Sequence, residues 1–170
     1  MPLPAAGLCF CPWTDLAATG ESLRTNDGRC PSFRPATIPK YARIYLGDAS
    51  DRDPYASPVF GDLAGLPPLL LQAASNELLL DDARRIHQSV QEGGGVSRLE
   101  IFDDLFHDWP ILDGFLPEAR QALAAGRGVP RRARVLRIAH ARHLRRTSSV
   151  CASGSRAPPS APGAGPRTSC

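Results

Sequence analysis

The stretch LLLQAASNELLLDDARR, residues 69–85, decides the fold. Residues 69–74 are apolar without clean alternation, which is typical of a strand in a parallel sheet that is covered on both faces. Ser75 or Asn76 can cap a helix that continues to about Glu92. The expected apolar stripe of this helix comprises Leu79, Ala83, Ile86 and Val90. The glycines Gly93, Gly94 and Gly95 end it. The stretch therefore predicts a buried strand, a turn and an amphipathic helix.

The same alternation extends outward along the chain. GLCFCPW, residues 7–13, and SRLEIF, residues 97–102, predict two further strands. TIPKYARIYLG, residues 37–47, predicts a helix with Ile38, Tyr41, Ala42, Tyr45 and Leu46 on one side and Gly47 at its end. LPEARQALAA, residues 116–125, predicts another helix with Pro117 near its first position. Strands that alternate with helices indicate the α/β class with a parallel sheet.

Charge divides the chain into two parts. Residues 126–170 contain ten arginines and no Asp, Glu or Lys, which gives +10, whereas residues 1–125 hold the other ten basic residues and all 17 acids, which gives −7. We expect a folded domain over 1–125 and a disordered Arg/Ala/Pro/Gly/Ser-rich tail over 126–170. The tail has three open interpretations: a product of a shifted reading frame, a segment that binds nucleic acid or an anionic surface, or inert disorder.

The five cysteines do not form a metal or disulfide pattern. They contain no C-x-x-C pair, and Cys9 and Cys11 alternate on the first predicted strand, so we expect both to point to one face. Reduced structural thiols are the favoured interpretation over zinc ligands or disulfides, and neither a metal nor a cofactor is expected. The sequence has no apolar run of the roughly 18 residues that a membrane span needs and no secretory signal. We therefore expect a cytoplasmic protein.

Several segments together resemble a known family. PWTDL at 12–16, YLGDASDRDPYASPVFGDLAGLPPLLLQAAS at 45–75, FHDW at 106–109 and LPEARQAL at 116–123 are similar to the C-terminal half of the bacterial hormone-sensitive-lipase-like esterases. The resemblance covers roughly residues 3–125. It implies a partial α/β-hydrolase fold, with the last three parallel strands, their helices and a cap-side segment in 14–66. It also implies hydrolysis of short-chain carboxylic esters without a cofactor.

The resemblance assigns roles to individual residues. His107 takes the position of the catalytic base, and Asn76 takes the position where the family carries an aspartate. The serine of the family's G-x-S-x-G motif and its H-G-G-G oxyanion loop both lie upstream of the matched region. No G-x-S-x-G occurs in the 170 residues, so the nucleophile is absent from this sequence. We therefore expect little or no esterase activity from the chain by itself.

Nearby carboxylates offer alternatives for the acid. Glu77, Asp81 or Asp82 could replace it, although Asp81 and Asp82 are better explained by the positive end of a helix dipole. Three further acids flank His107: Asp103, Asp104 and Asp108. They are either solvated loop residues or residues that hold the imidazole in place. Trp13 and Trp109 are interpreted as packing residues.

The expected partners follow from the partial fold. The first strand would leave one sheet edge open, which favours self-association or pairing with an upstream half in another polypeptide. An ester substrate is expected only in such a completed protein. The alternative function is non-enzymatic binding of nucleic acid or of an anionic surface through the arginine-rich tail.

Overall fold

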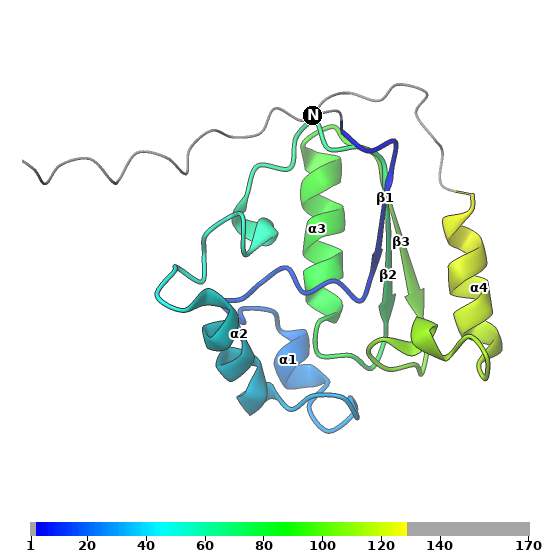
Figure 1. The fold of residues 1–170 in the computed structure, drawn as a ribbon, viewed down its shortest axis with the longest axis horizontal. Coiled ribbons are helices and arrows are strands. Elements are labelled where there is room, and N and C mark those ends of the chain that lie inside the picture. Colours follow the sequence, from blue (N-terminus) through cyan, green and yellow to red (C-terminus); the bar gives the residue numbers. More distant parts are fainter. Residues whose placement is uncertain (1–2, 129–170) are drawn as a thin grey trace, which may run out of the picture. The chain divides into compact units, whose positions relative to one another are not determined.

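The computed structural model of this chain describes residues 3–128. It contains a parallel sheet of three strands, β1 (Gly7–Phe10), β2 (Leu69–Ala74) and β3 (Ser97–Phe102), in the order β1-β2-β3. Figure 1 shows β2 in the centre with β1 at one side. The predicted α/β class and all three predicted strands are confirmed, although the first strand ends at Phe10 rather than at residue 13.

One face of the sheet packs against α3 (Leu80–Glu92). The strand register places Cys9 and Leu99 on either side of Leu71, so the three side chains share this face. The α3 residues that pack against them are Ile86 and Val90. The predicted stripe of this helix is confirmed, because Leu79, Ala83, Ile86 and Val90 are all buried.

The opposite face packs against α4 (Pro117–Gly126) and the short 3-10 helix η3 (Trp109–Leu112). Ala74 from β2 meets Ala119 and Ala122 of α4 in this second cluster. Trp109 is fully buried in it and lies 4.9 Å from the ring of Phe102. The prediction that Trp109 is a packing residue is therefore confirmed. In Figure 1, α3 and α4 lie on opposite sides of the sheet.

The long segment between β1 and β2 contains α1 (Ser22–Thr25), η1 (Pro35–Thr37), α2 (Ile38–Leu46) and η2 (Pro58–Phe60). In this segment, α1 and α2 lie toward the carboxyl ends of the strands, and the later part runs back along α3 to the amino end of β2 (Figure 1). Cys30 and Ile38 from this segment pack against Leu78 and Leu79, just before α3. It corresponds to the predicted cap-side segment, and it covers the turn that follows β2.

The predicted side of α2 is only partly buried. Ile38, Ala42 and Leu46 contact the core, whereas Tyr41 and Tyr45 are exposed. The tyrosines lie next to the buried stripe in sequence, and their hydroxyls gain from remaining in water. Gly47 ends the helix with a positive φ of 57°, as its position predicts.

The predicted helix cap at Ser75 or Asn76 is wrong, because α3 begins only at Leu80. The side-chain amide of Asn26 donates hydrogen bonds to the carbonyls of Ser75 and Glu77, at 2.9 Å each. These two carbonyls are thereby held in a turn, and the helix starts after it.

Two further expectations concern the arginine-rich tail and membrane-spanning helices. Apart from residues 126–128, the arginine-rich tail lies outside the described residues, and α4 continues to Gly126, one residue past the predicted boundary. Among residues 3–128, every helix is too short or too polar to cross a bilayer.

Candidate active site

An imidazole and a carboxylate meet at the carboxyl edge of the sheet. Glu77 lies in the turn after β2, and His107 lies in the loop after β3, so parallel pairing of the two strands brings the residues together. Nδ1 of His107 lies 2.8 Å from Oε2 of Glu77. The other oxygen of Glu77 accepts a hydrogen bond of 2.8 Å from the backbone N–H of Ala74. Glu77 is fully buried, and each of its two carboxylate oxygens has a hydrogen-bond partner.

Asn76, to which the resemblance assigns the acid position, is not the residue that contacts His107. Its backbone N–H donates to the carbonyl of Leu105 at 3.3 Å, and its side-chain oxygen is buried without a partner in residues 3–128. The chain turns back at this point, because the N–H of Glu77 donates to the carbonyl of Ala74. The turn therefore directs the side chain of residue 77, not that of residue 76, toward the imidazole.

The other acids considered as replacements have different partners. Asp81 accepts a hydrogen bond from the backbone N–H of Ser22 at 2.8 Å. Asp82 accepts from the backbone N–H groups of Thr14 and Asp15 at 2.7 and 2.8 Å. Both belong to the first turn of α3, as expected for the helix dipole, but they also hold the loop after β1 against that helix. Of the three alternatives, Glu77 is the one beside His107.

Two further groups lie beside the imidazole of His107. The ring of Phe33 packs edge-on against it, with 4.9 Å between centroids. Oδ2 of Asp108 lies 3.4 Å from Nε2, so Asp108 is the flanking aspartate that faces the ring. Asp104 instead uses its backbone N–H to donate to the hydroxyl of Ser75. The His107 side chain is 11% exposed, which leaves a narrow path from solvent to the ring.

A thiol lies beside this pair. Cys11 follows β1 with a positive φ of 43° and is buried on the α4 side of the sheet, whereas Cys9 packs on the α3 side. The prediction that both cysteines point to one face is therefore wrong, because the strand ends at Phe10 and the backbone reverses. Sγ of Cys11 accepts a hydrogen bond of 3.2 Å from the N–H of Asp108. Burial and the nearby charge of Glu77 raise the pKa of this thiol well above its ordinary range.

A buried charge network supports the loop after β1. Burial raises the pKa of Asp82 to about 7, despite the backbone hydrogen bond from Thr14. Burial also acts to raise the pKa of Asp15, but hydrogen bonds from Thr19 and Arg85 outweigh it and lower the pKa overall. Arg85 reaches Asp15 from α3 at 2.7 Å. The network fixes the start of α3 relative to the loop that leads out of the Cys11 turn.

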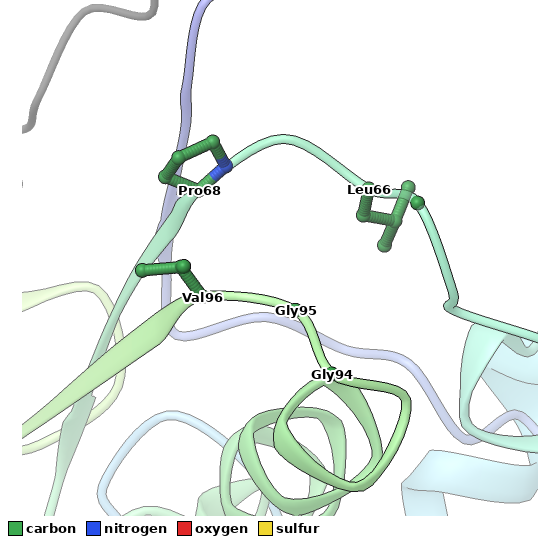
Figure 2. Close-up of a pocket in the computed structure, with 6 residues that line it drawn as sticks. Leu66, Pro68, Gly94, Gly95 and Val96 are labelled. Atoms are coloured by element: carbon green, nitrogen blue, oxygen red, sulfur yellow. The ribbon is translucent and has the colours of Figure 1, made fainter.

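Two hollows lie at the opposite end of the sheet. One of about 120 Å³ is lined by Leu66, Pro68 and the glycines before β3, as Figure 2 shows. The other, of about 290 Å³, lies between Leu70, Arg98 and the end of α4. Both are at the amino ends of β2 and β3. They are therefore remote from the carboxyl edge where His107 and Glu77 meet.

Residues 1–111 match the family described as the alpha/beta hydrolase fold. The chain belongs to this family. The predicted fold is thereby confirmed, and the resemblance to bacterial hormone-sensitive-lipase-like esterases is confirmed by the solved esterase structure described below. Glu77 and His107 lie at the carboxyl edge of the sheet. Open α/β sheets in general bind their ligands at this edge.

Individual relatives of this α/β-hydrolase are esterases and acetyl-hydrolases. It is 43% identical over 122 residues to an acetyl-hydrolase of Streptomyces hygroscopicus, covering 72% of this chain and 41% of the relative. It is 32% identical to an esterase of Acinetobacter venetianus, over 72% of this chain and 41% of that protein. A crystal structure of an esterase from the bacterial hormone-sensitive lipase family is 45% identical with a TM-score of 0.71, covering 73% of this chain and 42% of that one. The chain thus spans about two fifths of the length of these relatives.

Proposed function

We propose that this chain supplies the acid and base of a carboxylic ester hydrolase, with Glu77 as the acid and His107 as the base. The observation that carries the proposal is the 2.8 Å contact between Nδ1 of His107 and the buried carboxylate of Glu77. A carboxylate that accepts the Nδ1 proton leaves Nε2 as the basic nitrogen, which is the arrangement that activates a hydroxyl nucleophile. Esterase and acetyl-hydrolase relatives favour an ester as the substrate.

The dyad leaves two requirements of ester hydrolysis unmet. The reaction needs a hydroxyl that attacks the carbonyl and donors that stabilise the oxyanion. The 170 residues contain neither G-x-S-x-G nor H-G-G-G. We therefore propose that the chain alone does not turn over an ester, and that the missing groups come from a second polypeptide segment that pairs with β1, one of the two edge strands of the described sheet.

A chimera tests this proposal directly. Residues 3–128 would replace the matching segment of the Streptomyces hygroscopicus acetyl-hydrolase, which retains its own remaining sequence. We expect the chimera to cleave p-nitrophenyl acetate and His107→Ala in the chimera to abolish cleavage. The full chain alone, assayed in parallel, should show no cleavage above buffer.

Two results would contradict the proposal. A folded chimera without esterase activity would show that the dyad does not serve this chemistry. Cleavage by the full chain alone, lost on His107→Ala, would show that the nucleophile lies within these 170 residues.

A further inference from the structure

Three potential metal ligands from three different loops converge beside β2. They are Sγ of Cys11, a carboxylate oxygen of Glu77 and a ring nitrogen of His107, and all three atoms lie within 4.8 Å of one another. Cys11 follows β1, Glu77 follows β2 and His107 follows β3, so the sheet itself fixes their separation. Cys11 and Glu77 are buried, and His107 is the member through which solvent reaches the cluster.

Asp108 contacts two of the three ligands in the way that outer-sphere residues of metal sites do. Its backbone N–H donates to Sγ of Cys11 at 3.2 Å. Its carboxylate lies 3.4 Å from Nε2 of His107. A histidine that binds a metal through one nitrogen commonly donates its other N–H to a carboxylate, which fixes the tautomer and the ring orientation. The left-handed backbone of Asp108, with φ 61°, allows both contacts from a single residue.

We propose that Cys11, Glu77 and His107 bind one zinc ion, with the fourth coordination position open toward solvent. A thiolate, an imidazole and a carboxylate are a ligand set that zinc accepts, whereas magnesium and calcium require oxygen ligands. The thiolate and the carboxylate together balance the charge of Zn²⁺, which suits a buried position. This inference goes beyond the esterase proposal and does not rest on it.

The three ligand atoms, which all lie within 4.8 Å of one another, must adjust their separations to admit the ion. Zinc bonds of about 2.0–2.3 Å in a tetrahedron place ligand atoms roughly 3.3–3.7 Å apart. Nδ1 of His107 and Oε2 of Glu77 are now 2.8 Å apart, so a slight rotation of the imidazole opens the space. On binding, the thiol proton of Cys11 passes to solvent, and the single proton of the neutral imidazole moves from Nδ1 to Nε2 by exchange with solvent, so that Nδ1 is free to bind the ion.

Metal binding and the acid–base pair exclude each other. Zinc at Nδ1 takes the place of the proton that Glu77 accepts, and the ring proton that is then on Nε2 occupies the lone pair that acted as the base. A bound ion would therefore switch off any general-base role of His107. Removal of the ion by a chelator would restore the hydrogen bond between the two residues.

Cobalt(II) substitution into the full 170-residue chain tests the site without any activity measurement. Under reducing conditions, we expect one equivalent of Co²⁺ to produce tetrahedral d–d absorption together with a near-ultraviolet thiolate-to-cobalt band. Zn²⁺ should displace it. Cys11→Ser should remove the thiolate band, whereas Cys9→Ser, which alters the neighbouring thiol on the opposite face of the sheet, should retain it.

Competition with a chromophoric chelator then measures the contribution of the other residues. We expect His107→Ala to weaken Zn²⁺ binding by at least about 100-fold, and Asp108→Asn by about 10- to 100-fold, the range typical of outer-sphere partners. Circular dichroism of each variant establishes that it is folded. If the wild-type chain bound no metal while the chimera still hydrolysed the ester, this inference alone would be overturned.

Two outcomes would contradict the zinc site. One is the absence of a thiolate-to-cobalt band in the folded wild-type chain. The other is an unchanged band and affinity in folded Cys11→Ser, which would place the metal on other ligands.

Discussion

The carboxylate of Glu77 lies 2.8 Å from Nδ1 of His107, thirty positions later in the chain. The contact is specific to one member of an adjacent pair, because the side chain of Asn76 makes no hydrogen bond in residues 3–128 through its oxygen. The chemistry of the candidate site therefore depends on which of two consecutive side chains the turn after β2 directs inward.

The first prediction separates these two residues. In the acetyl-hydrolase chimera, Glu77→Gln should reduce kcat by up to about 10⁴-fold, the loss that the corresponding acid-to-amide change causes in the serine-protease triad. Asn76→Asp should leave kcat within a few fold, because the base already has a carboxylate partner. Steady-state kinetics with p-nitrophenyl acetate measures both. A large increase in kcat in Asn76→Asp, together with full activity in Glu77→Gln, would show that position 76 and not Glu77 provides the acid.

The strands and helices were predictable because their signals are local and repetitive. The apolar run at residues 69–74 and the stripe of α3 each contain several residues that agree. The position of His107 came from the family resemblance, since a single histidine in a loop has no periodicity. A prediction of a strand or a helix remains correct even when its boundary is wrong by one residue.

The identity of the acid does not tolerate such an error. Whether residue 76 or 77 faces the imidazole depends on the backbone of a turn that the distant amide of Asn26 holds in place. Likewise, Cys11 reaches the site only because its φ of 43° ends the alternation of β1. Neither a long-range hydrogen bond nor a single positive φ at a non-glycine residue leaves a recognisable pattern in one sequence.

The second prediction concerns the buried carboxylate of Asp82. Burial raises its pKa from the ordinary 3.8 to about 7, so the folded chain binds a proton that the unfolded chain releases. Its contribution to stability is complete below about pH 4 and is lost as the pH rises through about 7. The pKa of Asp15 is lowered instead, so its contribution to stability is lost only as the pH falls below the ordinary value of 3.8.

Urea unfolding of the full chain between pH 4 and 8 measures the Asp82 effect. Asp82→Asn should flatten the decline in unfolding free energy, because the amide cannot ionise yet can still accept from Thr14 and Asp15. Asp81→Asn is the matched control and should retain the decline, since Asp82 is intact. An identical pH profile in Asp82→Asn and wild type would rule out this assignment.

The third prediction concerns the central strand. Leu71 is fully buried between Cys9 and Leu99 on the α3 side of the sheet. Leu71→Ala should lower the unfolding free energy by about 2–5 kcal/mol, because it removes buried apolar atoms and leaves a cavity. Ile44→Ala, at a side chain that is 79% exposed on α2, should change it by less than about 0.5 kcal/mol. Equal losses in the two variants would contradict the packing described for β2.

The fourth prediction uses two glycines of different surroundings. A Cβ on Gly95, which lies beside the end of α3 in Figure 2, would be 2.8 Å from Cγ1 and 2.9 Å from the carbonyl oxygen of Val90. The N–H of Gly95 donates to that same carbonyl at 2.8 Å, so the backbone cannot move away without breaking the bond. Gly95→Ala should therefore destabilise the chain by about 1–3 kcal/mol.

Gly114→Ala is the matched substitution, because a Cβ at Gly114 meets no atom within 4 Å. The added methyl restricts the unfolded chain, so we expect stability to be unchanged or to rise by up to about 1 kcal/mol. Thermal and urea unfolding of both variants provide the comparison. If Gly95→Ala were as stable as Gly114→Ala, the close approach of residue 95 to Val90, and with it the path of the chain from α3 into β3, would be incorrect.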